Sequence, residues 1–322
     1  MFLSVLLFAI GLVLLISGGD WFVDGATGVA RRFNLPDIVV GATVVSIGTT
    51  LPEVMVSTTG ALMGSGAMAY GNAIGSIICN TALIAAISIV CNPGPVNAKS
   101  MKTPAFFFFF AAAIYCLAAY GLGTFPRWLG FAMLAVFAVY MFLTVRDGLR
   151  NPDAADEEKE ERERPFWQDL TFLVSGACVI AIGAHLLVEH GQIIALELGV
   201  PETVVALLFV ALGTSLPELI TTITSLRKGR ASLGVGNVIG ANVFNLVLVS
   251  GVAVTLAPFD VPVENTLLNT GLNLSLVFDI PVMLLVMSLM VFPALKHKRL
   301  SRWQGTALLA IYTAFVVLQF IL

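Results

Sequence analysis

Charged residues are scarce in this chain. Only 11% of its 322 residues are Asp, Glu, Lys or Arg, whereas soluble globular domains average about 25%. Hydrophobic residues make up 58%, and the mean hydropathy is +0.94. This amount of charge cannot cover the surface of a water-soluble globule. The composition therefore predicts an all-α integral membrane protein in a lipid bilayer. The near-balanced net charge of −3 gives no indication of nucleic acid as a partner.

Cysteine and histidine are also few. The four cysteines lie in or at the ends of apolar stretches, with neither metal-ligand spacing nor the paired pattern of a secreted scaffold. They are Cys79, Cys91, Cys116 and Cys178. Three histidines are scattered, and no HExxH motif occurs. We therefore expect no enzyme activity and no resident cofactor.

Ten apolar runs are each long enough for a membrane-spanning helix of about 20 residues. They cover approximately 2–28, 36–62, 68–91, 103–121, 128–145, 167–194, 201–226, 231–257, 272–293 and 303–322. The first run lacks a basic n-region and a cleavage site, so we interpret it as a retained helix rather than a signal peptide. The sequence thus predicts ten transmembrane helices.

A polar, highly charged stretch divides these runs into two groups of five. It reads NPDAADEEKEERERP over residues 151–165. We expect a first half at 1–146, a charged linker at 147–166 and a second half at 167–322. Sixteen of the seventeen Lys and Arg residues follow odd-numbered runs, and only Arg127 follows an even-numbered one. The positive-inside rule then places the linker in the cytoplasm and both termini outside.

An internal repeat relates the two halves. A shift of 165 residues superposes GTTLPE at 48–53 on GTSLPE at 213–218, and GNAIGSIICN at 71–80 on GNVIGANVFN at 236–245. Because each half crosses the membrane an odd number of times, the second must be inverted relative to the first. Inverted repeats of this kind are typical of secondary transporters.

Each repeat places a glutamate deep in an apolar run. Glu53 and Glu218 lie about seventeen residues into the second and seventh runs, which corresponds to about 25 Å of helix. A charge at that depth costs at least ~2.5–3.5 kcal/mol. The intramembrane parts of the repeats contain no Lys or Arg to neutralise it. A cation-binding pair is the favoured interpretation, and a proton relay or a protonated structural pair are the alternatives.

Oxygen-bearing residues surround both glutamates. Thr49 and Thr214 precede them by four residues and therefore share their helix face. Pro52 and Pro217 remove a backbone N–H, so carbonyls at 46–48 and 211–213 are expected to turn toward a cavity. The following helix adds polar residues on one face, namely Asn72, Ser76 and Asn80 in one copy and Asn237, Ala241 and Asn245 in the other. Its GxxxG motifs are expected to pack the helices that contribute ligands.

This all-oxygen inventory suits hard cations. Ca²⁺ takes six to eight oxygen ligands, whereas zinc and copper prefer nitrogen or sulfur. Two carboxylates balance one Ca²⁺, and they could instead hold sodium ions or protons. Competition of two ions for one pair of carboxylates is a sufficient physical basis for antiport.

The double motif resembles the sodium/calcium exchanger family of calcium/cation antiporters, in its compact prokaryotic form. The resemblance implies Na⁺/Ca²⁺ exchange by alternating access in a prokaryotic cytoplasmic membrane, with Ca²⁺ and Na⁺ as transported ions. It implies a site formed by Glu53, Glu218, Thr49, Thr214, Thr50, Ser76, Asn80, Ser215 and Asn245 with the carbonyls of Ser46 and Ala211. It also implies that the first and sixth helices slide against a fixed core.

Two positions depart from the family pattern. Ala241 lacks the hydroxyl of its counterpart Ser76, and Asn245 stands where some members have Asp. The amide supplies less charge, which disfavours K⁺ co-transport. Proton/calcium or potassium-dependent exchange stays an alternative within the class. A cation channel is disfavoured because channels are usually rings of identical subunits.

Overall fold

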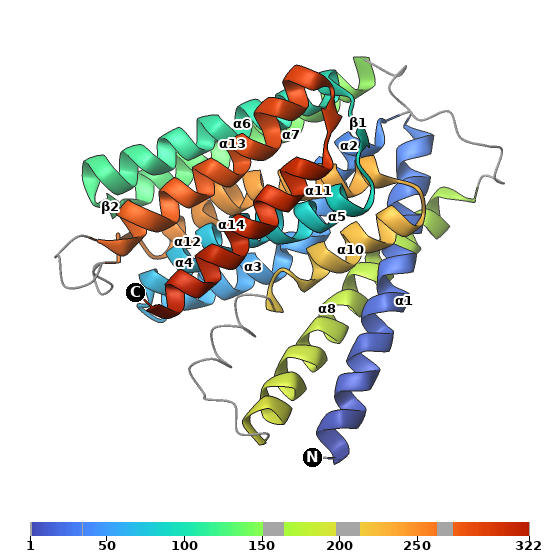
Figure 1. Cartoon of the computed structure of the whole chain (residues 1–322), viewed down its shortest axis with the longest axis horizontal. Coiled ribbons are helices and arrows are strands. Elements are labelled where there is room, and N and C mark those ends of the chain that lie inside the picture. Colours follow the sequence, from blue (N-terminus) through green and yellow to red (C-terminus); the bar gives the residue numbers. More distant parts are fainter. Residues whose placement is uncertain (1, 34, 151–163, 198–212, 263–272, 322) are drawn as a thin grey trace.

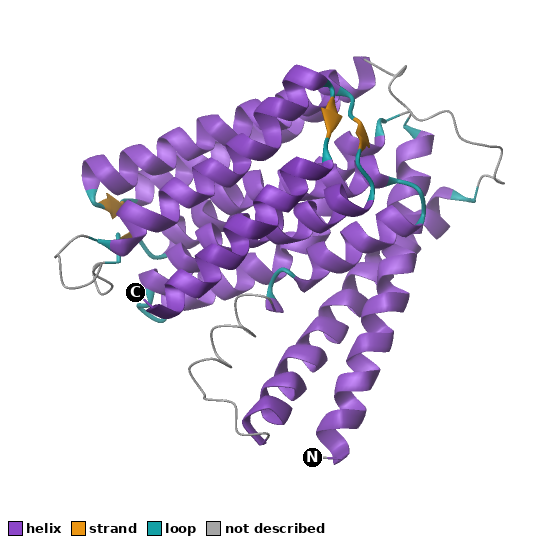
Figure 2. Cartoon of the chain, viewed as in Figure 1, coloured by secondary structure: helices purple, strands orange, loops and turns teal. Residues whose placement is uncertain are grey.

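A computed structural model describes residues 2–33, 35–150, 164–197, 213–262 and 273–321. Helices make up nearly all of it (Figure 2). The helices are α1 (Phe2–Arg32), α2 (Asp37–Val40), α3 (Ser46–Leu62), α4 (Gly66–Cys79), α5 (Ala86–Cys91), α6 (Ala98–Cys116), α7 (Arg127–Arg150), α8 (Phe166–Glu197), α10 (Leu216–Arg227), α11 (Ala231–Phe244), α12 (Ser250–Leu256), α13 (Ile280–His297) and α14 (Arg302–Ile321).

Two short antiparallel strand pairs connect helix ends. Strand β1 (Gly94–Pro95) pairs with β4 (Arg299–Leu300), and β2 (Thr124–Phe125) pairs with β3 (Phe259–Asp260). Each pair joins the first half of the chain to the second. The strands are only two residues long, so they tie loops together rather than form a core.

Eight helical stretches of the described chain are long and apolar enough to cross a membrane. Six of them match the first six predicted spans, and the other two match the eighth and ninth. The seventh span lies partly outside the described residues, with α10 covering its second part. Helix α14 covers the tenth. The structure therefore confirms an all-α membrane protein, and the count of ten spans stays a prediction.

The division into two halves and a linker at 147–166 stays a prediction, and the described helices reach into both ends of that linker. Helix α7 continues to Arg150, four residues beyond the expected end of the first half at 146. Helix α8 begins at Phe166. Most of the charged stretch, residues 151–163, lies outside the described residues.

Helices α1 and α8 form a long antiparallel pair that projects from the rest of the bundle (Figure 1). Their contact uses glycines: a Cβ on Gly11 would lie 2.9 Å from the carbonyl oxygen of Gly183, and one on Gly18 would lie 3.1 Å from that of Gly176. The 165-residue shift converts Gly11 into Gly176 and Gly18 into Gly183. Equivalent helices therefore pack against each other in opposite directions.

The centre of the bundle is formed by the second repeat motif and its neighbours. In the most apolar part of Ala231–Leu256, 83% of the residues are buried. The corresponding fraction is 28% in α1 and 22% in the stretch that contains α8. Helix α11 packs through its GxxxG motif, because a Cβ on Gly240 would lie 2.4 Å from Oγ of Ser46. This confirms the expected packing for this copy. Gly71 and Gly75 of the other motif have no such neighbour among the described residues.

Short π-helical segments interrupt the central helices. They span Gly41–Val45, Asn80–Ala85 and Asn245–Val249, and two of them begin at the equivalent residues Asn80 and Asn245. The widened turns release backbone groups, and such turns are frequent at functional sites.

The break expected from the motif prolines is found in only one copy. Pro52 lies inside α3, which is helical from Ser46, so the expectation of an irregular backbone at 46–48 is wrong. The irregular turn lies just before it, at Gly41–Val45. In the second copy Ser215 caps α10, and Pro217 occupies the first turn, where a missing N–H costs nothing.

Candidate cation site

The two predicted glutamates meet at the centre of the bundle. Glu53 on α3 and Glu218 in the first turn of α10 are both 0% exposed. Their carboxylates lie within electrostatic range of each other. Oγ1 of Thr50, one turn before Glu53, is 3.5 Å from Oε1 of Glu218. The two halves of the chain therefore bring one acid each to a shared, water-excluded place.

Most of the carboxylate oxygens have no hydrogen-bond donor in the described part of the chain. This holds for both oxygens of Glu53 and for Oε2 of Glu218. Buried polar groups are nearly always hydrogen-bonded, and an unpaired buried carboxylate is far more costly than an unpaired neutral group. The arrangement is stable only if a proton or a cation accompanies these oxygens.

Further unpaired polar atoms belong to predicted ligand residues. Both amide atoms of Asn80 and of Asn245, and Oγ of Ser215, are buried without a partner among the described residues. Asn80 and Asn245 are the first residues of their π-helical segments. They occupy equivalent positions in the two repeats, and each carries a neutral amide oxygen of the kind that hard cations bind.

Hydrogen bonds cross between the halves in a matched pattern. Thr49 donates to Oδ1 of Asn237 at 3.2 Å, and Thr214 donates to Oδ1 of Asn72 at 3.4 Å. The 165-residue shift converts one bond into the other. Asn72 and Asn237 were not among the predicted ligands, although their place on the polar helix face was a signal that could have identified them.

The remaining predicted residues vary in their surroundings. The Ser46 hydroxyl has acceptors within reach, because its Oγ lies 2.8 Å from the carbonyl oxygen of Gly41 and 3.0 Å from that of Asn237. Ser76 is 2% exposed on α4. Ala241 is fully buried and supplies no hydroxyl. Ala211 lies outside the described residues.

Basic residues are held elsewhere in the described structure. Nζ of Lys228 is 2.7 Å from Oδ1 of Asp24, and Nη1 of Arg230 is 3.0 Å from Oδ2 of Asp37. These pairs lie near the end of α10 and the start of α11. Neither glutamate takes part in the ion pairs found between described residues. The negative charge of the site is therefore available to a mobile cation.

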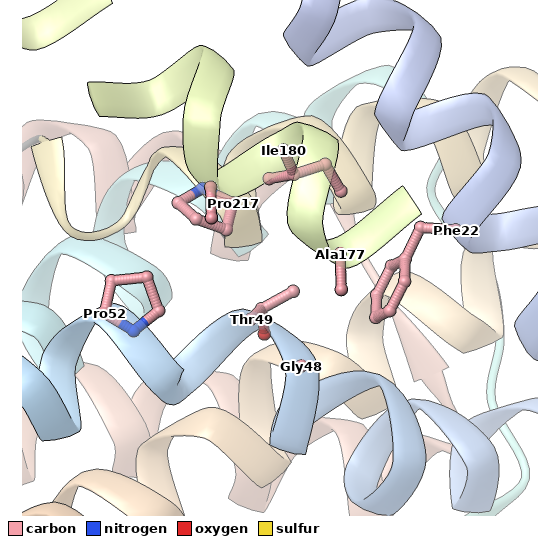
Figure 3. Close-up of a pocket in the computed structure, with 8 residues that line it drawn as sticks. Phe22, Gly48, Thr49, Pro52, Ala177, Ile180 and Pro217 are labelled. Atoms are coloured by element: carbon pink, nitrogen blue, oxygen red, sulfur yellow. The ribbon is translucent and has the colours of Figure 1, made fainter. Parts of the chain in front are cut away.

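A small pocket lies between the two motif turns and helices α1 and α8. Its lining residues are Phe22, Gly48, Thr49, Pro52, Ala177, Ile180, Ala181 and Pro217. Figure 3 shows Pro52 and Thr49 on one side of the pocket and Pro217, Ile180 and Ala177 on the other. The two motif prolines, each of which directly precedes one of the acids, thus line the same pocket.

The donor set is chemically uniform. It consists of carboxylate, hydroxyl and amide groups, and the described residues contain no cluster of three or more His, Cys, Asp or Glu side chains. Oxygen donors of this kind match Ca²⁺ and Na⁺ better than zinc or copper. Such an ion would be the transported substrate rather than a resident cofactor.

Comparison with known proteins is consistent with this chemistry. The family model for the sodium/calcium exchanger protein matches residues 3–146 and 169–321. An uncharacterized membrane protein of Methanocaldococcus jannaschii is 33% identical over 96% of both chains. A sodium/calcium exchanger of Methanosarcina acetivorans is 28% identical over 98% of both.

Solved structures give the same result. The sodium-calcium exchanger NCX_Mj superposes with a TM-score of 0.79 at 31% identity, covering 98% of each chain. These matches confirm the resemblance carried by the two motifs. The chain is an integral, multi-pass membrane protein and belongs to the sodium/calcium exchanger family, a family of cation antiporters.

Proposed function

We propose that this protein exchanges Na⁺ for Ca²⁺ by alternating access, at a site built on Glu53 and Glu218. The observation that carries the proposal is the pair of fully buried glutamates, one from each half. Three of their four carboxylate oxygens lack a partner among the described residues. Two negative charges in a low-dielectric interior require a matching positive charge, and one Ca²⁺ or two Na⁺ would supply it.

The ligands of this site are proposed to come from both repeats. The side chains of Thr50, Ser76, Asn80, Ser215 and Asn245, and backbone or side-chain oxygens of Ser46, Thr49, Ala211 and Thr214, would complete the coordination begun by the glutamates. Their mixture of charged and neutral oxygens suits both a divalent ion and smaller monovalent ones. Since both ions need the same two carboxylates, binding of one displaces the other.

The repeat arrangement supports an alternating-access mechanism. Helices α1 and α8 are equivalent by sequence and antiparallel in the structure, as a pair of inverted repeats requires. The crossed threonine–asparagine bonds follow the same symmetry. An ion site at the interface of two inverted halves can open to opposite sides by small movements of one half relative to the other.

The proposed orientation follows from the distribution of basic residues. The charged linker and the loops that follow odd-numbered spans lie in the cytoplasm, and both termini lie outside. The membrane is proposed to be a prokaryotic cytoplasmic membrane, and one of the matched relatives is an inner membrane protein of Escherichia coli that is 30% identical over 81% of this chain.

The test is ⁴⁵Ca²⁺ flux in proteoliposomes at clamped pH. With Na⁺ inside, we expect Ca²⁺ uptake that stops when the Na⁺ gradient is collapsed by an ionophore. Empty liposomes are the control. Uptake that ignores Na⁺ but follows an imposed pH gradient would establish proton/calcium exchange instead. Passive current without any counter-ion would indicate a channel and contradict the proposal.

A further inference from the structure

Asn72 is held by both halves of the chain. Its amide nitrogen donates to Oγ of Ser57 at 2.8 Å and to the carbonyl oxygen of Glu53 at 3.3 Å. Its amide oxygen accepts a bond from Thr214 at 3.4 Å. One side chain therefore links the helix that carries Glu53 to the turn that precedes Glu218, and it does so without being a predicted ion ligand.

The equivalent residue Asn237 is bonded differently. Its oxygen accepts from Thr49 at 3.2 Å and lies 3.3 Å from Oγ of Ser46, both in the first half. Its amide nitrogen has no acceptor among the described residues, and neither has the hydroxyl of Thr222 a partner there. Thr222 is the counterpart of Ser57 under the 165-residue shift. The bond present in one copy is thus absent in the other.

The unpaired groups of the second copy belong to two helices in direct contact, α10 and α11. Asn237 is 0% exposed and Thr222 is 2% exposed. Helices α10 and α11 pack directly here, because a Cβ on Gly234 would lie 3.2 Å from Cγ2 of Thr222. Leaving a buried amide and a buried hydroxyl unpaired is unfavourable. In the first copy the equivalent groups on α3 and α4 are bonded at 2.8 Å, so the same geometry between α10 and α11 would pair them.

We propose that Asn72 and Asn237 are positioning residues that form a two-position clasp. In the conformation described here the first clasp, Asn72 to Ser57, is closed and the second, Asn237 to Thr222, is open. In the conformation that faces the other side of the membrane the second clasp closes and the first opens. This inference rests on the alternating access proposed above. It explains why Asn72 and Asn237, at equivalent positions of the repeat, differ in their hydrogen bonds.

The clasp makes opposite predictions for two equivalent hydroxyls. Ser57→Ala removes a bond from the present conformation and therefore favours the other one. Thr222→Val removes a bond from the other conformation and therefore favours the present one. A hydrogen bond contributes about 0.5–1.5 kcal/mol net, so each variant should change the ratio of the two conformations by about two- to tenfold.

The readout is the half-saturating Ca²⁺ concentration on each side of the membrane. In a two-state carrier the apparent affinity on one side falls as the fraction of protein facing that side falls. The measurement uses full-length protein in proteoliposomes of determined orientation. We expect the ratio of the two half-saturating concentrations to move about two- to tenfold in opposite directions for Ser57→Ala and Thr222→Val. Ser57→Thr retains a hydroxyl and should restore the wild-type ratio.

Shifts in the same direction, or an unchanged ratio in both variants, would overturn the clasp. Should Ser57→Ala fail to fold, Thr222→Val alone decides, because it removes a hydroxyl that is unpaired in this conformation and so should not impair folding. The wild-type protein in the same vesicles separates this inference from the proposed function. If the wild type shows no Na⁺-dependent exchange, the proposed function fails. If the wild type exchanges but the two variants do not shift the ratio of half-saturating concentrations in opposite directions, only the clasp is refuted.

Discussion

The Thr50 hydroxyl lies 3.5 Å from a carboxylate oxygen of Glu218, a residue 168 positions further along the chain. Thr50 shares its helix with Glu53, so this contact places the two acids of the repeat around one buried volume. A long, weak bond of this length leaves the Glu218 carboxylate free to move toward a cation. The predictions below test that volume and its framework.

Neutralising either acid should abolish exchange without unfolding the protein. We expect Glu53→Gln and Glu218→Gln to reduce Na⁺-dependent ⁴⁵Ca²⁺ uptake to the level of empty liposomes, because one carboxylate cannot balance Ca²⁺. The midpoint of thermal unfolding in detergent should stay unchanged or rise, since each substitution removes a buried carboxylate that forms no ion pair between described residues. Cys91→Ser, at an exposed thiol, is the matched control. Near-normal uptake in both glutamine variants would refute the site.

Replacing Asn245 by aspartate should make transport more sensitive to pH. The substitution adds a third acid where both amide atoms lack a partner among the described residues. When the new carboxyl is protonated at low pH it resembles the amide, so the variant should then behave like the wild type. As pH rises and the group ionises, the apparent affinity for cations should change by about tenfold, equivalent to ~1.4 kcal/mol. Identical pH profiles of Ca²⁺ uptake would place Asn245 away from the ions.

Adding one methyl group at Gly240 should destabilise the centre of the bundle. The new Cβ in Gly240→Ala would lie 2.4 Å from Oγ of Ser46 and 2.6 Å from Cα of Ala42, so the helices must separate. Overpacking of this kind typically costs about 1–3 kcal/mol. Thermal unfolding in detergent should show a lowered midpoint. Ala113→Val, at an exposed position of α6, is the control and should leave the midpoint unchanged.

The buried pair of Asp37 and Arg230 should matter for stability rather than for ion binding. Both charged groups are at least nine-tenths buried, with contacts of 3.0 and 3.1 Å. Removing one partner of a buried ion pair is strongly destabilising, so Asp37→Asn should cost about 3 kcal/mol of unfolding free energy. Combining it with Arg230→Gln should recover part of that loss. If the double variant is no more stable than the single one, the two side chains are not coupled.

The sequence predicted much of the site because its signals are local and repeated. GTTLPE and GTSLPE identified Glu53 and Glu218, and the absence of nearby Lys and Arg indicated a mobile cation. The expected involvement of these residues as ion ligands stays a prediction. Bonds between the halves could not be foreseen, since nothing in the repeat says which face of one copy meets the other. The polar helix face pointed to Asn72 and Asn237, but their hydrogen-bond partners emerged only from the tertiary structure.

Local backbone geometry was less predictable than the position of the acids. Pro52 and Pro217 occupy equivalent positions, yet Pro217 lies in the first turn of α10, while Pro52 lies inside α3. The π-helical segments that begin at Asn80 and Asn245 have no sequence signature of their own. They depend on how neighbouring helices pack, which widens a turn at one place and not at another.

Composition and the 165-residue repeat indicated a membrane protein with one buried acid in each half, because burying charge in lipid is costly unless the residue has a functional partner. The double motif carried the resemblance to a family of cation antiporters, which the comparisons confirmed. The tertiary structure decided the pairing of the halves: which threonine meets which asparagine, and that equivalent residues differ in their bonds. Those choices depend on contacts between segments far apart in sequence, where small shifts of packed helices exchange one set of hydrogen bonds for another.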